Sequence, residues 1–346
     1  MQSIIQKIKK ANLTGRGGAC FPTADKWLMV KKAKGAKKYI VCNASEGEPG
    51  IKKDKYLLEK KTDHVIDGIL IAINYLKAEK AYIYLNPAYY KEFGKKLEKI
   101  INTLPIEVFK KQHKAGYIGG EESSALNHIE GKRIEPRLRP PFPTTSGLFE
   151  MPTLINNVET FYDVSLIAAN EYQGKKFYTI NGDCLYDGVY ELPENWTIAE
   201  VLKKTDNYPD FDFFVQVGGD ASGAVLNEQQ LNQQAGGGGS ITIHSCLKHN
   251  PIGLMKYWTN FFYNESCGQC APCREGLHRL KEEIEKKELN WQAIVRLLDN
   301  LEDTSFCGLG CSVKMPFSSY VNNILKNNDI KINLPVNQRQ CLCECF

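Results

Sequence analysis

The segment between residues 38 and 110 alternates between two hydrophobic patterns, and this alternation constrains the fold more than any other feature. Short apolar runs at 39–42, 81–85 and 106–109 suit buried strands. Residues 54–77 and 89–104, between these runs, carry apolar side chains at helical spacing. Strands that alternate with helices pair in parallel, with the helices on the sheet faces. The pattern therefore predicts an α/β domain built on a parallel sheet.

Three glycine-rich loops belong to this part of the chain. Two of them, 43–50 and 116–123, follow the first and third predicted strands, and the third, 15–22, precedes the sheet. Ligands of parallel sheets bind outside the carboxyl ends of the strands, and glycines let backbone N–H groups approach phosphate oxygens. None of the loops fits the G-x-G-x-x-G or Walker A pattern, and each alone is more typical of a tight turn than of a ligand loop. Three together favour a dinucleotide or a flavin.

The remaining sequence divides into two further regions and a tail. Residues 175–247 hold one helical pattern at 197–204, which suits a small β-grasp module together with four short strand patterns, at 177–180, 188–192, 213–217 and 241–244. Four helical patterns between 251 and 327 indicate a small bundle. We therefore expect an α/β protein whose successive parts are listed here: a Rossmann-like domain at 1–168, a ubiquitin-like β-grasp domain at 169–247, a four-helix domain at 248–330 and a cysteine-containing tail at 331–346.

Composition excludes several classes of protein. The 346 residues are 42% hydrophobic with a net charge of +4, an ordinary globular balance that predicts neither a nucleic-acid nor a membrane-surface partner. No apolar run approaches the ~18 residues of a membrane span, and the start lacks the apolar core of a signal peptide. We expect a cytoplasmic protein, peripheral to a membrane only through partner subunits. In that reducing compartment, clustered cysteines indicate metal or redox ligands before disulfides.

Twelve cysteines are distributed unevenly. Cys267, Cys270 and Cys273 form Cys-Gly-Gln-Cys-Ala-Pro-Cys, and Cys307 and Cys311 follow a helical stretch. Cysteines at steps of three suit a [4Fe-4S] cluster whose fourth ligand comes from elsewhere, whereas zinc sites more often pair two Cys-x2-Cys knuckles. Zinc and purely structural cysteines stay open on spacing alone, as does the choice of fourth ligand. The terminal Cys-Leu-Cys-Glu-Cys-Phe suits a thiol-bearing tail or a second metal site.

Five motifs in a fixed order resemble one family. They are Gly-Arg-Gly-Gly-Ala-Cys-Phe-Pro from Gly15, the Asn43 loop, 116–122, Pro-Thr-Leu-Ile-Asn-Asn-Val-Glu-Thr from Pro152, and Glu-Ser-Cys-Gly-Gln-Cys-Ala-Pro-Cys-Arg-Glu-Gly from Glu265. Together they resemble the flavin- and NADH-binding subunit of respiratory complex I and of NAD-linked hydrogenases and formate dehydrogenases. The resemblance implies the same three domains, with FMN, NAD(H) and one [4Fe-4S] cluster as cofactors.

The resemblance also implies roles for individual residues. Lys26 supplies positive charge to the FMN phosphate, Phe21 stacks on the nicotinamide nucleotide, and Glu48 hydrogen-bonds near the nicotinamide as the catalytic contact. Glu122 lies near the adenosine ribose and disfavours NADP by charge repulsion. The implied FMN set is Gly15, Arg16, Gly17, Lys26, Asn43, Ser45, Glu46, Tyr117, Gly120, Glu121, Asn156 and Asn157; the NADH set is Phe21, Glu48, Glu122, Arg139 and Phe142; and the cluster ligands are Cys267, Cys270, Cys273 and Cys307.

The resemblance implies an NADH-oxidising or NAD-reducing, diaphorase-type flavoprotein subunit of a larger complex. NADH passes a hydride to the flavin, which releases electrons singly to the cluster and on to partner subunits. We expect these partners to be a thioredoxin-like [2Fe-2S] subunit and a larger iron–sulfur subunit, with no nucleic acid and no membrane insertion. The alternative is a non-catalytic iron–sulfur or zinc scaffold. Cys20, Ser45 and Met29 depart from the family pattern, and the six histidines form no recognisable constellation.

Overall fold

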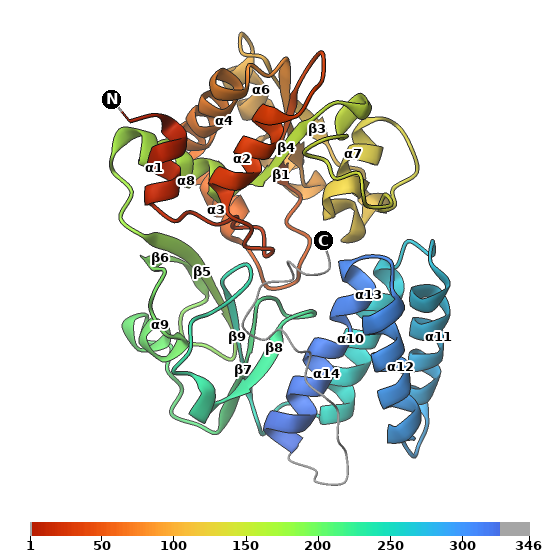
Figure 1. Ribbon diagram of the computed structural model, residues 1–346. Coiled ribbons are helices and arrows are strands. Elements are labelled where there is room, and N and C mark those ends of the chain that lie inside the picture. The colour runs from red at the N-terminus through yellow and green to blue at the C-terminus, as the bar shows by residue number, and fades with distance from the viewer. Residues whose placement is uncertain (1, 326–346) are drawn as a thin grey trace. The chain divides into compact units, whose positions relative to one another are not determined.

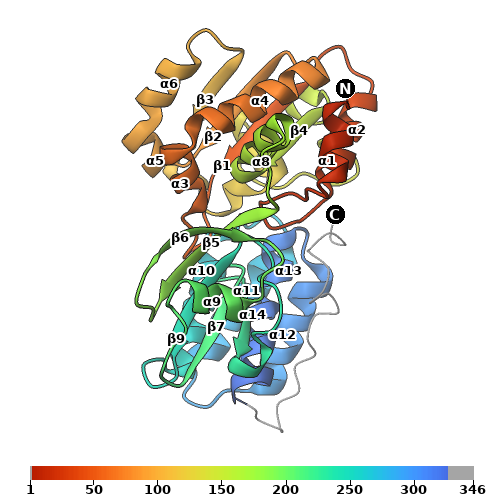
Figure 2. The same ribbon diagram turned by 90° about the vertical axis from the view of Figure 1, so that its left-hand side faces the viewer.

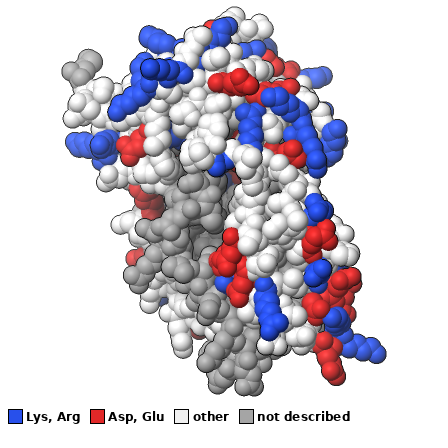
Figure 3. All heavy atoms as spheres, turned by 45° about the vertical axis from the view of Figure 1, so that its right-hand side comes forward, with Lys and Arg blue, Asp and Glu red and all other residues white. Residues whose placement is uncertain are grey.

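The computed structural model describes residues 2–325 and divides them into two compact units. The first holds residues 2–47 and 52–175, and the second holds the short segment Glu48–Ile51 together with the chain from Lys176 onward. The three predicted domains and their boundaries stay a prediction, and the tail that contains Cys341, Cys343 and Cys345 lies outside the described residues. On the face shown in Figure 3, acidic and basic side chains are interspersed. No helix among residues 2–325 has the length and apolar character that crossing a bilayer requires.

The first unit is built on a four-stranded parallel sheet, in the order β3-β2-β1-β4. Its strands are β1 Tyr39–Ala44, β2 Lys80–Leu85, β3 Ile106–Lys110 and β4 Thr153–Asn157. Ile40, Val41 and Cys42 are fully buried, as expected for a strand covered on both faces. The three predicted strands are confirmed. The fourth, β4, was not predicted, and it pairs with β1 instead of extending the sheet beyond β3.

Helices cover both faces of this sheet (Figure 1). They are α1 Ile4–Lys10, α2 Thr23–Lys32, α3 Lys53–Lys60, α4 Thr62–Leu76, α5 Pro87–Tyr89, α6 Lys95–Ile101, α7 Glu122–Ile129 and α8 Val158–Ala169, with a π turn over Tyr90–Gly94. Helix α7 packs Ala125 and Leu126 against Val41 on one face, while α4 and α8 pack on the other. The predicted helix at 54–77 is two helices, because Lys61 leaves the helical conformation at φ −131°.

Helices α4 and α8 approach each other closely at Gly68. A methyl group at Gly68 would lie 1.9 Å from the carbonyl oxygen of Phe161, so only glycine fits this contact. Helix α8, which directly follows β4, therefore packs against α3 and α4, the two helices that follow β1.

The second unit contains a mixed five-stranded sheet in the order β6-β5-β9-β7-β8. Its strands are β5 Lys175–Gly182, β6 Gly188–Pro193, β7 Phe213–Val217, β8 Ala224–Asn227 and β9 Ser240–Ser245, and its helix is α9 Ile198–Lys204. Strands β5 and β9 are parallel, whereas β7 runs antiparallel to both β9 and β8. Val201 and Leu202 of α9 pack into the core of one sheet face. The four predicted strands and the helix are confirmed, and β8 was not predicted.

Helices complete the second unit (Figure 2). They are α10 Pro251–Glu265, α11 Ala271–Glu285, α12 Trp291–Thr304, α13 Gly308–Ser312 and α14 Lys314–Tyr320, followed by a π turn over Val321–Leu325. Asn250 and Asn290 cap α10 and α12 through their side-chain oxygens. Fully buried leucines at 277, 280, 298 and 301 join α11 to α12, so the helical spacing read from the sequence is the spacing of the bundle core.

Candidate functional site

The carboxyl ends of β1 and β4 form the switch point of the first sheet. The chain leaves β1 toward β2 and later returns to β4 on the other side of β1, and crevices at such points bind ligands. Asn43 and Asn157 are register partners here, and Asn157 Nδ2 donates to the Asn43 carbonyl at 3.4 Å. The side chain of Asn156 is held by α2, since Trp27 Nε1 of that helix donates to Asn156 Oδ1 at 3.1 Å.

The first glycine-rich loop lies against this switch point. Gly15 N donates to the Phe21 carbonyl at 2.9 Å and closes the loop, and a methyl group at Gly17 would lie 3.4 Å from Asn157 Cβ. Arg16 is buried and turns toward α8, where its Nε lies 3.0 Å from Asp163 Oδ2. Its backbone N–H donates to Thr160 Oγ1 at 3.0 Å. Arg16 therefore anchors the loop to α8.

The third glycine-rich loop reaches the end of β1. Asn43 Nδ2 donates to the Gly120 carbonyl at 2.8 Å, and a methyl group at Gly120 would lie 3.0 Å from Ser45 Oγ. A methyl group at Gly47 would lie 3.3 Å from Tyr117 Cα. These close approaches place Asn43, Ser45, Tyr117 and Gly120 together, as the sequence predicted for neighbouring loops of one edge.

Residues with different predicted roles are ion-paired at this edge. Lys26 Nζ donates to the Ile155 carbonyl at 2.9 Å and pairs with the Glu122 carboxylate. Glu121 caps α7 by accepting from Ser124 N at 2.8 Å, and it pairs with Arg139. The predicted phosphate ligand and the predicted ribose contact are thus neighbours.

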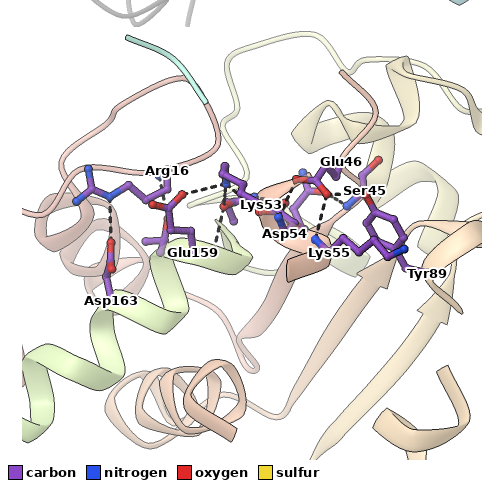
Figure 4. A network of polar contacts seen from close by, with 12 residues as sticks. Arg16, Ser45, Glu46, Lys53, Asp54, Lys55, Tyr89, Glu159 and Asp163 are labelled. Carbon is purple, nitrogen blue, oxygen red and sulfur yellow. Dashed lines mark hydrogen bonds and ion pairs between the residues drawn. The ribbon is translucent and has the colours of Figure 1, made fainter. Parts of the chain in front are cut away.

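Behind the switch point lies a buried charge network, drawn in Figure 4. Lys53 Nζ lies 2.8 Å from Asp54 Oδ1 and 3.1 Å from Glu159 Oε2, and it donates to Asn157 Oδ1 at 2.8 Å. Asn157 Nδ2 donates to Asp54 Oδ2 at 2.6 Å. Burial acts to lower the pKa of Lys53, but the carboxylates of Asp54 and Glu159 outweigh it and the pKa is raised. The network fixes both polar atoms of the Asn157 amide.

Glu46 adjoins the same network at the start of α3. Its carboxylate accepts from Asp54 N at 2.7 Å, from Lys55 N at 3.1 Å and from the Tyr89 hydroxyl at 2.6 Å. Burial, and then the negative charge of Asp54, raise the pKa of Glu46 to about 7. This carboxyl group therefore changes charge near neutral pH.

Glu48 belongs to the second unit. Its Oε1 accepts from Ala221 N at 3.1 Å and from Ser222 N at 2.9 Å. A methyl group at Gly219, where φ is +140°, would overlap the Glu48 carboxylate at 2.2 Å. Glycine is thus required for the turn that binds this carboxylate, and the predicted role of Glu48 beside the nicotinamide stays a prediction.

The cysteine triplet lies at the start of α11. Burial raises the pKa of Cys273 to about 11, and the neighbouring thiols of Cys270 and Cys267 contribute in the same direction. A methyl group at Gly310 would lie 3.4 Å from Cys273 Cβ, so the segment that begins at Cys307 lies beside the triplet. Among residues 2–325, no three Cys, His, Asp or Glu side chains are placed to hold a single metal ion.

Comparisons with known proteins agree on one family. Residues 8–166 match the model of the Nuo51 FMN-binding domain, and residues 253–327 match that of the NADH-ubiquinone oxidoreductase-F iron-sulfur binding region. A subunit of the NADH-quinone oxidoreductase of Rhizobium meliloti (strain 1021) is 31% identical, over 90% of this chain and 84% of its own length. The chain belongs to the Nuo51 family of NADH-quinone oxidoreductase subunits.

Hydrogenase subunits are also similar to this member of the Nuo51 family. The alpha subunit of the NAD-reducing hydrogenase HoxS of Cupriavidus necator is 32% identical over 91% of this chain, which spans 58% of that subunit. The crystal structure of an NAD+-reducing [NiFe]-hydrogenase in the H2-reduced state has a TM-score of 0.85 and 28% identity. The match covers 97% of this chain and 63% of the hydrogenase chain. The mixed α/β fold with a parallel sheet is therefore that of the family.

Both family cofactors fit the residues that are present. For FMN, Gly17 and Gly120 leave room beside Asn157 and Ser45 that a Cβ would reduce, and Asn43 and Asn157 bring amide groups to the same edge. For a [4Fe-4S] cluster, the donor set is chemically right: three thiols come from one loop, and Cys307 and Cys311 lie on the adjacent segment. Cys311 Sγ lies 3.6 Å from the Ser305 carbonyl oxygen, which it contacts as a donor.

Two predicted nucleotide contacts lie at the surface of the first unit. Phe142 is 37% exposed, and Phe21 is half-buried in the glycine-rich loop. Met29, at a position where the resemblance led us to expect an aromatic residue, is 48% exposed. Their roles toward NADH stay predictions.

The sequence signals did not single out the buried groups behind the site. Lys53, Asp54 and Glu159 lie within or just after the landmark loops, and their only sequence signal is that position. Two histidines are neighbours in the second unit: His244 Nδ1 and His249 Nε2 are 3.4 Å apart, and His249 Nε2 is 3.1 Å from Asp183 Oδ2. Pairs such as this one form between residues of a strand end and a following loop, so only the tertiary structure identifies them.

Proposed function

We propose that this chain is the NADH-oxidising, or NAD-reducing, diaphorase-type subunit of a multi-subunit redox complex. The observation that carries the proposal is the convergence of three glycine-rich loops on the carboxyl ends of β1 and β4, in a chain that also holds the cysteine triplet. Bound FMN would supply the redox chemistry, which comprises hydride exchange with NAD(H) and transfer of single electrons. The three-domain order, with α/β, β-grasp and four-helix parts, belongs to this proposal.

The residues at the switch point bind and orient. The loop of Gly15, Arg16 and Gly17 holds FMN, with the ammonium of Lys26 beside its phosphate. Asn43 lines the isoalloxazine side of the pocket, and Asn156 and Asn157 complete it. The buried Lys53 network keeps the Asn157 amide in one orientation, because both of its polar atoms are engaged.

A second set of residues accepts the nucleotide. Phe21 and Phe142 offer aromatic faces, Glu48 a hydrogen bond near the nicotinamide, and Arg139 a positive charge. Glu122 disfavours a 2′-phosphate. The ion pair with Lys26 holds the Glu122 carboxylate in place, which supports its selective role. Ser45, Glu46, Tyr117, Gly120 and Glu121 complete the proposed flavin pocket.

Electrons leave through the second unit. Cys267, Cys270, Cys273 and Cys307 are the proposed ligands of a [4Fe-4S] cluster, which would supply single-electron chemistry. The proposed partners are a thioredoxin-like [2Fe-2S] subunit and a larger iron–sulfur subunit. We propose a cytoplasmic location for the protein. Its partner subunits would provide any association with a membrane complex.

A visible spectrum of protein purified without oxygen tests the proposal. We expect the spectrum to show flavin bands on top of a broad iron–sulfur absorbance. We expect both to bleach when NADH is added. A colourless protein that contains zinc, or a coloured one that NADH leaves unchanged, refutes it and favours the non-catalytic scaffold.

A further inference from the structure

The connection between α7 and the turn at Leu148–Glu150 is a long loop. Residues 131–147 form neither a helix nor a strand, and they carry two of the proposed nucleotide contacts, Arg139 and Phe142. Loops of this length in compact domains are usually disordered or functional. This loop is held by specific bonds, which begin at Arg137.

One side chain joins the two ends of residues 138–146. Arg137 Nη1 donates to the Gly147 carbonyl at 2.9 Å, and Arg137 Nε donates to Asn127 Oδ1 of α7 at 2.8 Å. The backbone N–H of Arg137 also donates to Ser123 Oγ of α7 at 2.9 Å. The guanidinium therefore closes residues 138–146 into a loop and fixes that loop to α7.

The buried carboxylate of Glu130, at the end of α7, completes this closure. Glu130 Oε2 lies 2.9 Å from Arg137 Nη2, and Glu130 Oε1 accepts from Phe149 N at 2.8 Å. Burial acts to raise the pKa of Glu130, but hydrogen bonds from Lys132 and from these two groups outweigh it, and the pKa is lowered. Glu130 thus binds the segments on both sides of the loop.

The far end of the loop has a strained backbone. Phe149 and Glu150 have φ values of +52° and +62°, in the left-handed region that residues other than glycine seldom adopt. Such conformations persist only where the surroundings fix them, and they are frequent at ligand clamps. Here the bond from Phe149 N to Glu130 fixes the backbone, and the Phe149 ring packs on Tyr39 of β1 at 5.4 Å.

The same contacts extend to Arg139. Ser123 Oγ, which accepts from the backbone N–H of Arg137, donates to Glu121 Oε2 at 2.6 Å. The other oxygen of the Glu121 carboxylate pairs with Arg139. The proposed nucleotide contact at Arg139 is therefore connected to Arg137 through two side chains of the α7 start.

We propose that the Glu130–Arg137 ion pair is a positioning device of the nucleotide site, which holds residues 138–146 in the arrangement that binds NAD(H). The inference rests on the proposed function, which makes Arg139 and Phe142 nucleotide contacts. A loop already in its binding arrangement loses less conformational freedom when the ligand binds, so the pair raises affinity for NADH and NAD+ alike. Binding that is equal in the ground and transition states leaves kcat unchanged.

The test measures the dissociation constant of NAD+ by titration of FMN-loaded protein, with kcat at saturating NADH and ferricyanide as acceptor. Arg137→Gln removes the guanidinium, and Arg137→Lys keeps the charge on one nitrogen that cannot reproduce the planar fork. Glu130→Gln removes the carboxylate charge. Lys132→Met is the matched control, because Lys132 Nζ lies 2.6 Å from the same Glu130 oxygen but its side chain is 61% exposed.

We expect Arg137→Gln to raise the dissociation constant about tenfold, as when about a tenth of the loops adopt the binding arrangement. Arg137→Lys should raise it about threefold, and Lys132→Met should leave it unchanged. Both kcat and the FMN content should stay at the wild-type level in all these variants. Glu130→Gln should also weaken binding, and it decides alone if Arg137→Gln does not fold.

A double-mutant cycle with Phe142→Ala shows whether the pair acts through the loop. If it does, the loss of NAD+ affinity in the variant that carries both Phe142→Ala and Arg137→Gln is smaller than the product of the two single losses. A loss equal to that product, or a wild-type affinity in Phe142→Ala, overturns the inference.

Unchanged dissociation constants in Arg137→Gln and Glu130→Gln overturn the inference and leave the proposed function standing. A fall in kcat or FMN content that accompanies the weaker binding also overturns it, since it reflects a general loss of structure. So does an equal effect of Lys132→Met. FMN-loaded wild-type protein that NADH does not reduce overturns the proposed function, and the inference with it.

Discussion

Replacement of Lys53 by methionine should be among the most damaging single changes in the first unit. Methionine has nearly the volume of the lysine stem, so the main loss is the ammonium and its three contacts, at 2.8, 3.1 and 2.8 Å. Both carboxylate side chains that remain, Asp54 and Glu159, are at most 3% exposed. Removing one member of a buried ionic network costs about 3–5 kcal/mol, because the remaining charges are left uncompensated.

The loss should depend on pH in a definite direction. Without Lys53, the pKa of Asp54 rises further, since the cation that opposed its burial is gone. The native state of the variant then binds a proton that the unfolded state releases, so its stability falls as pH rises through the raised pKa of Asp54. The gap between variant and wild type should therefore be largest near pH 7 to 8 and smaller near pH 5.

Thermal unfolding of the full chain at pH 5 and pH 7.5 measures both effects. For a unit of 150–250 residues, 3–5 kcal/mol corresponds to a fall in Tm of about 6–20 °C. Lys55→Met is the matched control, because Lys55 is 38% exposed and its ion pair with Glu92 is worth about 0–1 kcal/mol. A Lys53→Met protein within 2 °C of the control, or a gap that widens as the pH falls, refutes this reasoning.

Three further predictions concern specificity, packing and the cluster. Glu122→Gln should raise activity with NADPH relative to NADH about tenfold, the effect of roughly 1.4 kcal/mol of repulsion; an unchanged ratio in steady-state assays contradicts the assigned role. Gly68→Ala should lower the unfolding free energy by about 1–3 kcal/mol in chemical denaturation, since its Cβ meets the α8 backbone, whereas Gly253→Ala, with 3.6 Å to its nearest neighbour, should not. Cys307→Ser should abolish the iron–sulfur absorbance while Cys311→Ser retains it, and the reverse result would exchange their roles.

Much of the fold follows from local pattern alone. The apolar runs that became β1, β2 and β3 are short, bounded by polar loops and separated by helical spacing, so strand type and parallel pairing were predictable. Strand β4 was not predicted, because Thr153–Asn157 ends in two asparagines and its burial comes from pairing with β1 and from packing against helices distant in sequence. The break at Lys61 falls in the polar run 59–64, between two stretches of helical spacing that were predicted as one helix.

The sequence predicted which loops of the candidate site lie together, but not which partners its buried charged side chains contact. The loops of Asn43 and Gly120 could be placed together because the carboxyl ends of parallel strands share one edge. Gly17 and Asn157 were grouped with them through the family resemblance. The partners of Lys53 and of the buried Lys111 could not be placed, since each lysine bonds to a residue more than 60 positions away. A lysine in a single sequence carries no mark of burial, and its ordinary environment is solvent.

The sequence by itself determined the class of fold, the three glycine-rich loops and the cysteine triplet, because these depend on periodicity and spacing within short segments. The tertiary structure decided that β4 pairs with β1, that Glu122 pairs with Lys26, that Arg16 anchors a loop to α8, and that two lysines are buried behind and beside the switch point. The physical reason is that burial and charge pairing arise between distant segments, where only the packed chain fixes the distance between two side chains.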